Sequence, residues 1–128
     1  MKKKSKARIK QTGEVFTPPE LVERLLDQIP EEKFQNPDST FLDNAAGDGN
    51  FMVSLKERLL RYGHSEQHIL DNMLYAVEYM PDNHRRLCER IGVSPTHPHY
   101  VRADATQYDY SFGTIDPLGP VTLDDFFE

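Results

Sequence analysis

Residues 41–51 read Phe41-Leu42-Asp43-Asn44-Ala45-Ala46-Gly47-Asp48-Gly49-Asn50-Phe51. The stretch has an apolar approach, an acidic residue, two glycines and an apolar exit, which together predict a strand, a tight loop and a helix. Gly47 and Gly49 let the backbone turn sharply and approach a ligand, because no Cβ stands in the way. The third glycine of the G-x-G-x-x-G fingerprint is missing, which disfavours a nicotinamide or flavin site. Taken alone, a ligand-free β–α turn explains the stretch as well.

Two predicted helices flank this loop. Asn50 is a plausible cap for a helix over residues 50–62, whose apolar positions recur at helical spacing. Upstream, Thr17 is a candidate cap for a helix over residues 19–29, and Glu20 stands three positions later in the capping-box relation. A well-capped surface helix would explain this upstream segment without any ligand.

The loop resembles the first motif of S-adenosylmethionine-dependent methyltransferases, in the D-x-A-A-G-x-G-x-F form of the N6-adenine DNA methyltransferases of restriction-modification systems. Upstream, Gly13-Glu14-Val15-Phe16-Thr17-Pro18 is similar to the G-x-x-F-T-P motif of that family, which folds over the methionine end of the cofactor. Downstream, residues 74–78 read as a buried strand ending at Glu78, where an acid can accept hydrogen bonds from both ribose hydroxyls. A solvated carboxylate is the alternative for Glu78 alone. The three segments stand in the family's order, which favours the ligand-binding interpretation.

The spacing of the acidic residues differs from that of dinucleotide folds. Asp43 and Glu78 are 35 positions apart, whereas about 20 residues separate the glycine loop from the ribose acid in those folds. An additional helical element over residues 65–73 would account for the excess. A third strand is predicted over residues 99–102, and Asp104 after it can accept a hydrogen bond from the cofactor adenine. An Asp that simply begins a turn is the alternative.

The resemblance implies both a cofactor site and a catalytic motif. The expected S-adenosylmethionine-binding residues are Phe16, Thr17, Asp43, Ala45, Gly47, Gly49, Asn50, Glu78, Tyr79, Asp104 and Ala105. The family places an Asn, Asp or Ser, two prolines and an aromatic residue after the fourth strand, which is expected over residues 112–115. Asp116 and Pro117 would then hold the target amine of a flipped base. Leu118 and Gly119 stand where the motif has its second proline and its aromatic residue, so a D-P-x-G turn without catalytic function is the alternative.

The predicted fold is α/β: a Rossmann-like methyltransferase layer sandwich with a truncated, mostly parallel sheet flanked by helices. Strands are expected near residues 39–43, 74–78, 99–102 and 112–115, and helices near residues 19–29, 50–62, 65–73 and 81–91. The fourth strand would lie beside the first and leave an open edge, which favours a homodimer or a partner subunit there. The resemblance spans residues 13–104 well, and we expect the chain to be the cofactor half of the family's fold.

Charge is distributed unevenly along the 128 residues, whose formal net charge is −6. Residues 2–10 carry six Lys or Arg side chains and no acidic one, whereas the rest of the chain carries nine basic and 21 acidic residues. We therefore predict a basic disordered tail over residues 1–12 and a truncated methyltransferase-like domain over residues 13–128. The tail could contact DNA phosphates in a salt-sensitive way, or it could be a solubilising or interaction tail. The acidic body is a poor DNA-binding surface by itself.

Several classes of protein are disfavoured. No apolar run approaches the ~18 residues of a membrane span, and no secretory signal is recognisable, so we expect no membrane contact and a cytoplasmic location. Cys88 is the only cysteine and is expected to be a core or half-buried residue in a reducing compartment. The histidine pairs His64/His68 and His97/His99 have no third ligand at a motif spacing, so no metal is expected.

Two functions remain open. The first is a minimal or split N6-adenine DNA methyltransferase whose missing parts come from another copy or another polypeptide. The second is a degenerate methyltransferase domain that binds the cofactor, or a partner, without chemistry. The segment over residues 116–119 distinguishes the two.

Overall fold

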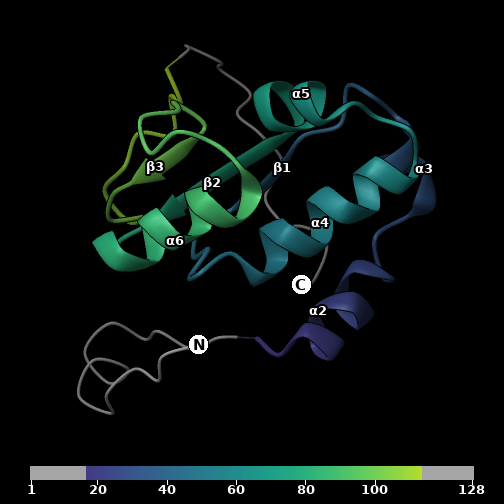
Figure 1. The fold of residues 1–128 in the computed structure, drawn as a ribbon, viewed down its shortest axis with the longest axis horizontal. Coiled ribbons are helices and arrows are strands. Elements are labelled where there is room, and N and C mark those ends of the chain that lie inside the picture. Colours follow the sequence, from purple (N-terminus) through teal and green to yellow (C-terminus); the bar gives the residue numbers. More distant parts are fainter. Residues whose placement is uncertain (1–16, 114–128) are drawn as a thin grey trace.

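The computed structural model describes residues 17–113, and Figure 1 shows their fold. In chain order the elements are α2 (Pro19–Leu26), α3 (Glu31–Gln35), β1 (Phe41–Asp43), α4 (Asn50–Arg61), α5 (Glu66–His68), the π-helix η1 (Ile69–Met73), β2 (Leu74–Glu78), α6 (Pro81–Ile91) and β3 (Tyr100–Arg102). No helix among these residues is long and apolar enough to cross a membrane. The predicted α/β class is confirmed.

The three strands form one parallel sheet in the order β1-β2-β3. Phe41 pairs with Leu74 in the β1–β2 ladder, and Glu78 pairs with Arg102 in the β2–β3 ladder. All three strands therefore deliver their carboxyl ends to one edge of the sheet, where ligands bind in open α/β folds. No described strand pairs with the outer edge of β1.

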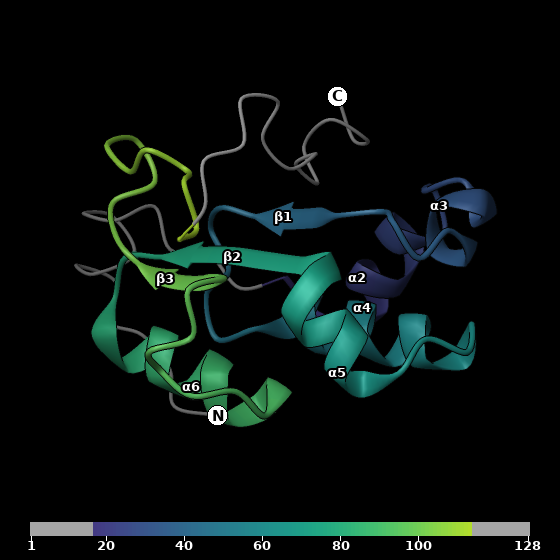
Figure 2. The same cartoon turned by 90° about the horizontal axis from the view of Figure 1, so that it is seen from above.

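The main core lies between the sheet and the helices on one of its faces (Figure 2). Successive strand residues point to opposite faces, so Leu74 and Ala76 enter this core while Tyr75 and Val77 do not. The helices contribute apolar residues at helical spacing, as the sequence predicted. The largest fully buried side chains include Leu26, Phe34, Met52, Leu55, Leu59, Ile69 and Met73.

The opposite face of the sheet is covered differently. There the segment over residues 103–113 lies against the strands (Figure 2). Its aromatic side chains pack on the sheet, and the ring centroids of Phe112 and Tyr75 are 5.0 Å apart in an edge-to-face pair. Phe112 and Gly113 have φ angles of 44° and 77°, so they form a turn and the predicted strand does not begin at residue 112. The amide of Phe112 instead donates to Tyr108 Oη at 2.8 Å. The rest of that predicted strand lies outside the described residues.

Most predicted helices are confirmed, with corrected ends. The expected helix over residues 19–29 ends at Leu26, and the next residues form a turn that still buries Ile29. The predicted element over residues 65–73 consists of α5 and the π-helix, which leads directly into β2. α3 was not predicted because it is only five residues long, and it places Phe34 against Phe41 with ring centroids 5.8 Å apart.

Both predicted helix caps were wrong. The N-cap of α2 is Pro18, with neither a capping side chain nor the predicted capping box from Thr17 to Glu20. The N-cap of α4 is Gly49 in a left-handed conformation, and Asn50 is already the first helical residue. Thr17 and Asn50 instead bond to each other, as described below.

The predicted core position of Cys88 is confirmed, since its side chain is fully buried. Burial raises the pKa of the Cys88 thiol, and the nearby Glu89 charge raises it further. We expect iodoacetamide to modify the folded protein more than about 100-fold more slowly than the urea-unfolded chain, because a thiolate must form and be reached. Mass spectrometry of the alkylated fraction over time measures this, and similar rates in both states would contradict the buried position.

We expect His99 to make the stability of the fold depend on pH. Burial lowers the pKa of its imidazole, with the neighbouring His97 ring adding to the effect, while the hydrogen bond to Leu74 O and the Asp71 charge oppose it. Below pH 6.5, the ordinary value of the group, the unfolded chain therefore binds a proton that the folded chain resists. We expect the free energy of unfolding to fall as the pH drops from 7.5 to 5.5. Urea titrations at both values measure this, and the slope should flatten in His99→Gln.

Candidate functional site

The glycine loop, defined as residues 44–49, begins where β1 ends. Asp43 Oδ1 accepts a hydrogen bond from Ala45 N at 3.1 Å, which tightens the first turn of the loop. Gly47 and Gly49 have φ angles of 57° and 99°, in the region that favours glycine. Both are buried, whereas Ala45 is exposed. The backbone of the loop thus passes close to the sheet and α6.

Glu78 ties the loop to the next strand. The residue is 7 % exposed, and its Oε1 accepts a hydrogen bond from Gly47 N at 2.8 Å. Oε2 accepts one from Met80 N, also at 2.8 Å. A buried carboxylate needs such donors, because burying a charge without them is costly. Glu78 is therefore not a solvated carboxylate at the end of a strand.

The ends of the three strands are joined through the backbone as well. Ala46 N donates to Val77 O at 3.2 Å, and Ala103 N donates to Glu78 O at 3.2 Å. These contacts bring the glycine loop, Glu78 and the segment after β3 together at one edge of the sheet. Tyr79 is 57 % exposed at the same edge. A planar ligand lying across this edge would contact Glu78, the exposed ring of Tyr79 and the backbone of the glycine loop.

The segment before α2 reaches the loop through a side chain. Asn50 Nδ2 donates to Thr17 O at 2.9 Å, over a separation of 33 positions. Asn50 Oδ1 in turn accepts a hydrogen bond from Arg90 Nη1 of α6 at 2.9 Å. The carbonyl of Thr17 therefore lies at the site. Phe16 lies outside the described residues.

Asp104 behaves first as a turn residue. Its Oδ1 accepts hydrogen bonds from Thr106 Oγ1 at 2.7 Å and from Thr106 N at 2.9 Å. These bonds lower the pKa of the Asp104 carboxyl, the side-chain bond most strongly. Ala105 follows in the same turn and accepts a hydrogen bond from Tyr110 Oη at 2.6 Å. One oxygen of Asp104 therefore stabilises a turn, as the alternative interpretation expected. That Asp104 accepts a hydrogen bond from a cofactor adenine stays a prediction.

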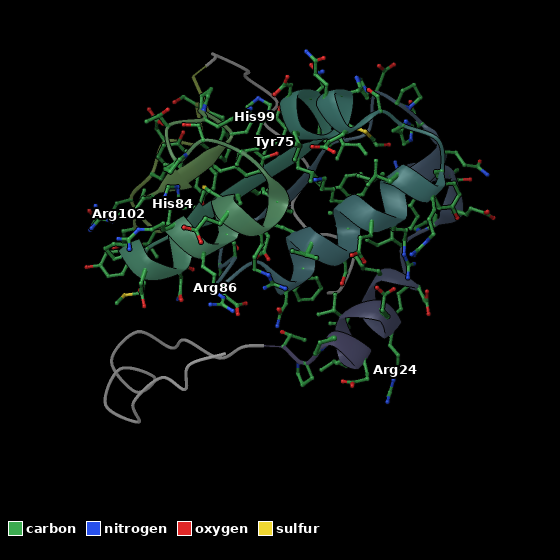
Figure 3. The ribbon with its side chains drawn as sticks, in the orientation of Figure 1. Arg24, Tyr75, His84, Arg86, His99 and Arg102 are labelled. Carbon is green, nitrogen blue, oxygen red and sulfur yellow. The ribbon has the colours of Figure 1, made fainter. Side chains whose placement is uncertain are left out.

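The histidines have structural partners. His64 Nε2 lies 2.6 Å from Phe34 O in α3, and His68 Nε2 lies 2.7 Å from Pro37 O in the stretch after α3. His84 contacts Tyr100 O at 2.8 Å, between α6 and β3 (Figure 3). Within residues 17–113, no three His, Cys, Asp or Glu side chains are grouped so that they could hold a metal ion.

The sequence profile of the N-6 DNA Methylase family matches residues 1–90. The chain belongs to this family. No curated protein and no solved structure matches the chain. The matched part contains the glycine loop, Glu78 and Thr17. Glu78 accepts a hydrogen bond from Gly47 of the loop, and Thr17 accepts one from Asn50, the residue after the loop. Asp104 follows the match, as do Asp116 and Pro117, which lie outside the described residues.

The N-6 DNA methylase match ends at Arg90, a residue that our sequence reasoning missed. Arg90 and the neighbouring loop residue Asp48 form an ion pair with Nη1 and Oδ1 3.4 Å apart. Arg86 and Arg90 are one helical turn apart on α6, so the sequence did carry a weak signal of a shared face. Nothing local in the sequence indicates that this face meets a loop 42 positions earlier.

Proposed function

We propose that this N-6 DNA methylase domain binds S-adenosylmethionine at the carboxyl edge of its sheet. The observation that carries the proposal is the Glu78 carboxylate, which is held by Gly47 N and Met80 N at the end of β2. An acid fixed there is suited to accept hydrogen bonds from ribose hydroxyls. The glycine loop leaves the backbone open to close approach by the rest of the ligand.

Asp43, Ala45 and Gly49 would line the loop side of the cofactor in this proposal, and Tyr79 would lie against the adenine. Phe16 and Thr17 would cover the methionine end. Asp104 and Ala105 would lie near the adenine amine. The backbone bond between Ala103 N and Glu78 O supports this assignment, because it sets the turn after β3 beside the acid.

The reaction we propose is N6-adenine DNA methylation of the restriction-modification kind, completed by another copy or another chain. The Asp116 carboxylate and the Pro117 carbonyl would accept hydrogen bonds from the two N–H groups of the target amine, so that the nitrogen lone pair is directed at the methyl group. A partner strand could pair with the outer edge of β1, with which no strand of residues 17–113 pairs. Residues 2–10 would contribute a salt-sensitive contact with DNA phosphates.

A non-catalytic binding module is the second candidate. It is favoured by Leu118 and Gly119, which replace the second proline and the aromatic residue of the family's catalytic motif. Such a domain would keep the cofactor site and lack methyl transfer.

Calorimetric titration of the purified chain with S-adenosylmethionine tests the proposal. Binding at micromolar ligand supports the cofactor site, and no binding up to millimolar ligand contradicts it. Transfer of a labelled methyl group to adenine-containing DNA then separates the two candidates. If transfer occurs, Asp116→Ala should abolish it without weakening cofactor binding, whereas equal transfer in that variant would exclude Asp116 from catalysis.

A further inference from the structure

Arg90 makes an unusual set of contacts from a single nitrogen. Its Nη1 donates to Asp48 O and to Asn50 Oδ1, each at 2.9 Å, and lies 3.4 Å from Asp48 Oδ1. These acceptors stand on both sides of Gly49, the residue at which the loop turns into α4. One side chain of α6 therefore holds the backbone on one side of the turn and a side chain on the other.

The Asp48 carboxylate explains why a cation is needed at this point. Its side chain is 2 % exposed, and neither oxygen accepts a hydrogen bond from any residue of the described stretch 17–113. Among residues 17–113, the nearest positive charges belong to Arg90 at 3.4 Å and Arg86 at 4.0 Å. Figure 3 shows Arg86 extending from α6, and its side chain is 51 % exposed. A buried carboxylate without a cation would be costly. Arg90 is the nearer and the less exposed of the two arginines, and it also donates to the loop backbone.

Through its contact with Asn50, Arg90 is also linked to the segment before α2. A carboxamide presents its oxygen and its nitrogen in opposite directions from one planar group. When Oδ1 accepts from Arg90, Nδ2 is turned toward Thr17 O, to which it donates at 2.9 Å. Arg90, Asn50 and Thr17 thus form one continuous chain of hydrogen bonds from α6 to the start of α2.

We propose that Arg90 is a positioning residue that fixes the glycine loop and the Thr17 carbonyl in the arrangement that binds the cofactor. The inference rests on the proposed function for its ligand, while its claim about the loop stands on the contacts of Arg90 alone. Without Arg90, the loop populates other conformations, and the apparent affinity falls by the fraction of molecules that keep the binding arrangement.

The test compares Arg90→Met with Arg86→Met in the full chain. Both variants remove one positive charge near Asp48, but only the first removes the hydrogen bonds to the loop and to Asn50. We expect the dissociation constant for S-adenosylmethionine to rise at least about 10-fold in Arg90→Met and less than about 3-fold in Arg86→Met. Arg90→Lys should restore part of the affinity, because one ammonium group can replace the single donating nitrogen.

A second readout separates positioning from general loss of stability. Amide hydrogen exchange, followed by NMR, reports on Gly47 N, which is bonded to Glu78, and Gly49 N, which is bonded to Ala46 O. We expect both amides to exchange faster in Arg90→Met while the amides in the middle of α4 keep their rates. Faster exchange throughout the molecule would indicate a merely structural role and overturn the proposal.

The remaining outcomes also decide. Equal affinity losses in Arg90→Met and Arg86→Met, or none in either, would overturn the proposal. Should Arg90→Met not fold, Asn50→Ala tests the same chain of bonds and should weaken binding about 10-fold, with unchanged affinity as the contrary result. If the unaltered protein binds no S-adenosylmethionine, the proposed function fails. The exchange rates of Gly47 and Gly49 then decide the positioning claim by themselves.

Discussion

Glu78→Gln is expected to weaken the binding of S-adenosylmethionine about 10- to 100-fold, which corresponds to about 1.4–2.7 kcal/mol. The carboxylate accepts from Gly47 N on one oxygen and from Met80 N on the other. Glutamine keeps one oxygen and turns an NH2 group toward the second donor, so one of these bonds is lost. The variant also lacks the negative charge that would accept the ribose hydroxyls. Calorimetric titration of the variant measures the change.

Glu57→Gln is the matched control for the charge. Glu57 is exposed on α4, so its replacement changes the net charge equally without touching the glycine loop. We expect its affinity to equal that of the unaltered protein. An unchanged affinity in Glu78→Gln, with circular dichroism showing a folded protein, would remove Glu78 from the cofactor site.

The second large effect is expected for Gly49→Ala. Gly49 has a φ of 99°, and a Cβ at this position would lie 2.9 Å from Leu87 Cδ1. The backbone conformation alone should cost about 1–3 kcal/mol, and displacing the fully buried Leu87 should add about 1–3 kcal/mol. Small domains have total free energies of unfolding of only about 5–15 kcal/mol. The two costs together would therefore remove a large share of the stability of the folded state. Urea unfolding followed by circular dichroism measures the loss.

Gly63→Ala separates the two contributions. Gly63 has a similar φ of 95°, but a Cβ there would meet no atom within 4 Å. It should therefore show the backbone cost without the clash. Equal destabilisation of the two variants would mean that Leu87 moves aside freely and that the loop does not depend on close packing against α6.

The fold was predictable where the signal was periodic and long. α6 was predicted with both ends correct, because Leu87, Cys88 and Ile91 stand at helical spacing between Pro81 and Gly92. β2 was found as an apolar run ending in an acid. The short helix α3 gave no such signal. α3 exists because Phe34 packs on Phe41, a contact that no local pattern of five residues can reveal.

Part of the site was also predictable from the sequence. The glycines, Asp43 and Glu78 stood out because their residue types suit tight turns and strand ends. The functions given to Thr17 and Asn50 as caps were wrong, since each has a long-range partner in the other. Asp48 and Arg90 were not singled out, because an ion pair between residues so distant along the chain leaves no local trace.

The sequence by itself determined the α/β class, the order of the segments and the acid that ends β2, because backbone preferences and hydrophobic periodicity are local properties. The tertiary structure decided which donors meet Glu78 and that Arg90 joins α6 to the glycine loop. It also decided that the segment over residues 103–113 covers the second face of the sheet. Such contacts depend on how the elements pack together, since packing brings distant residues within hydrogen-bonding distance only after the chain has folded.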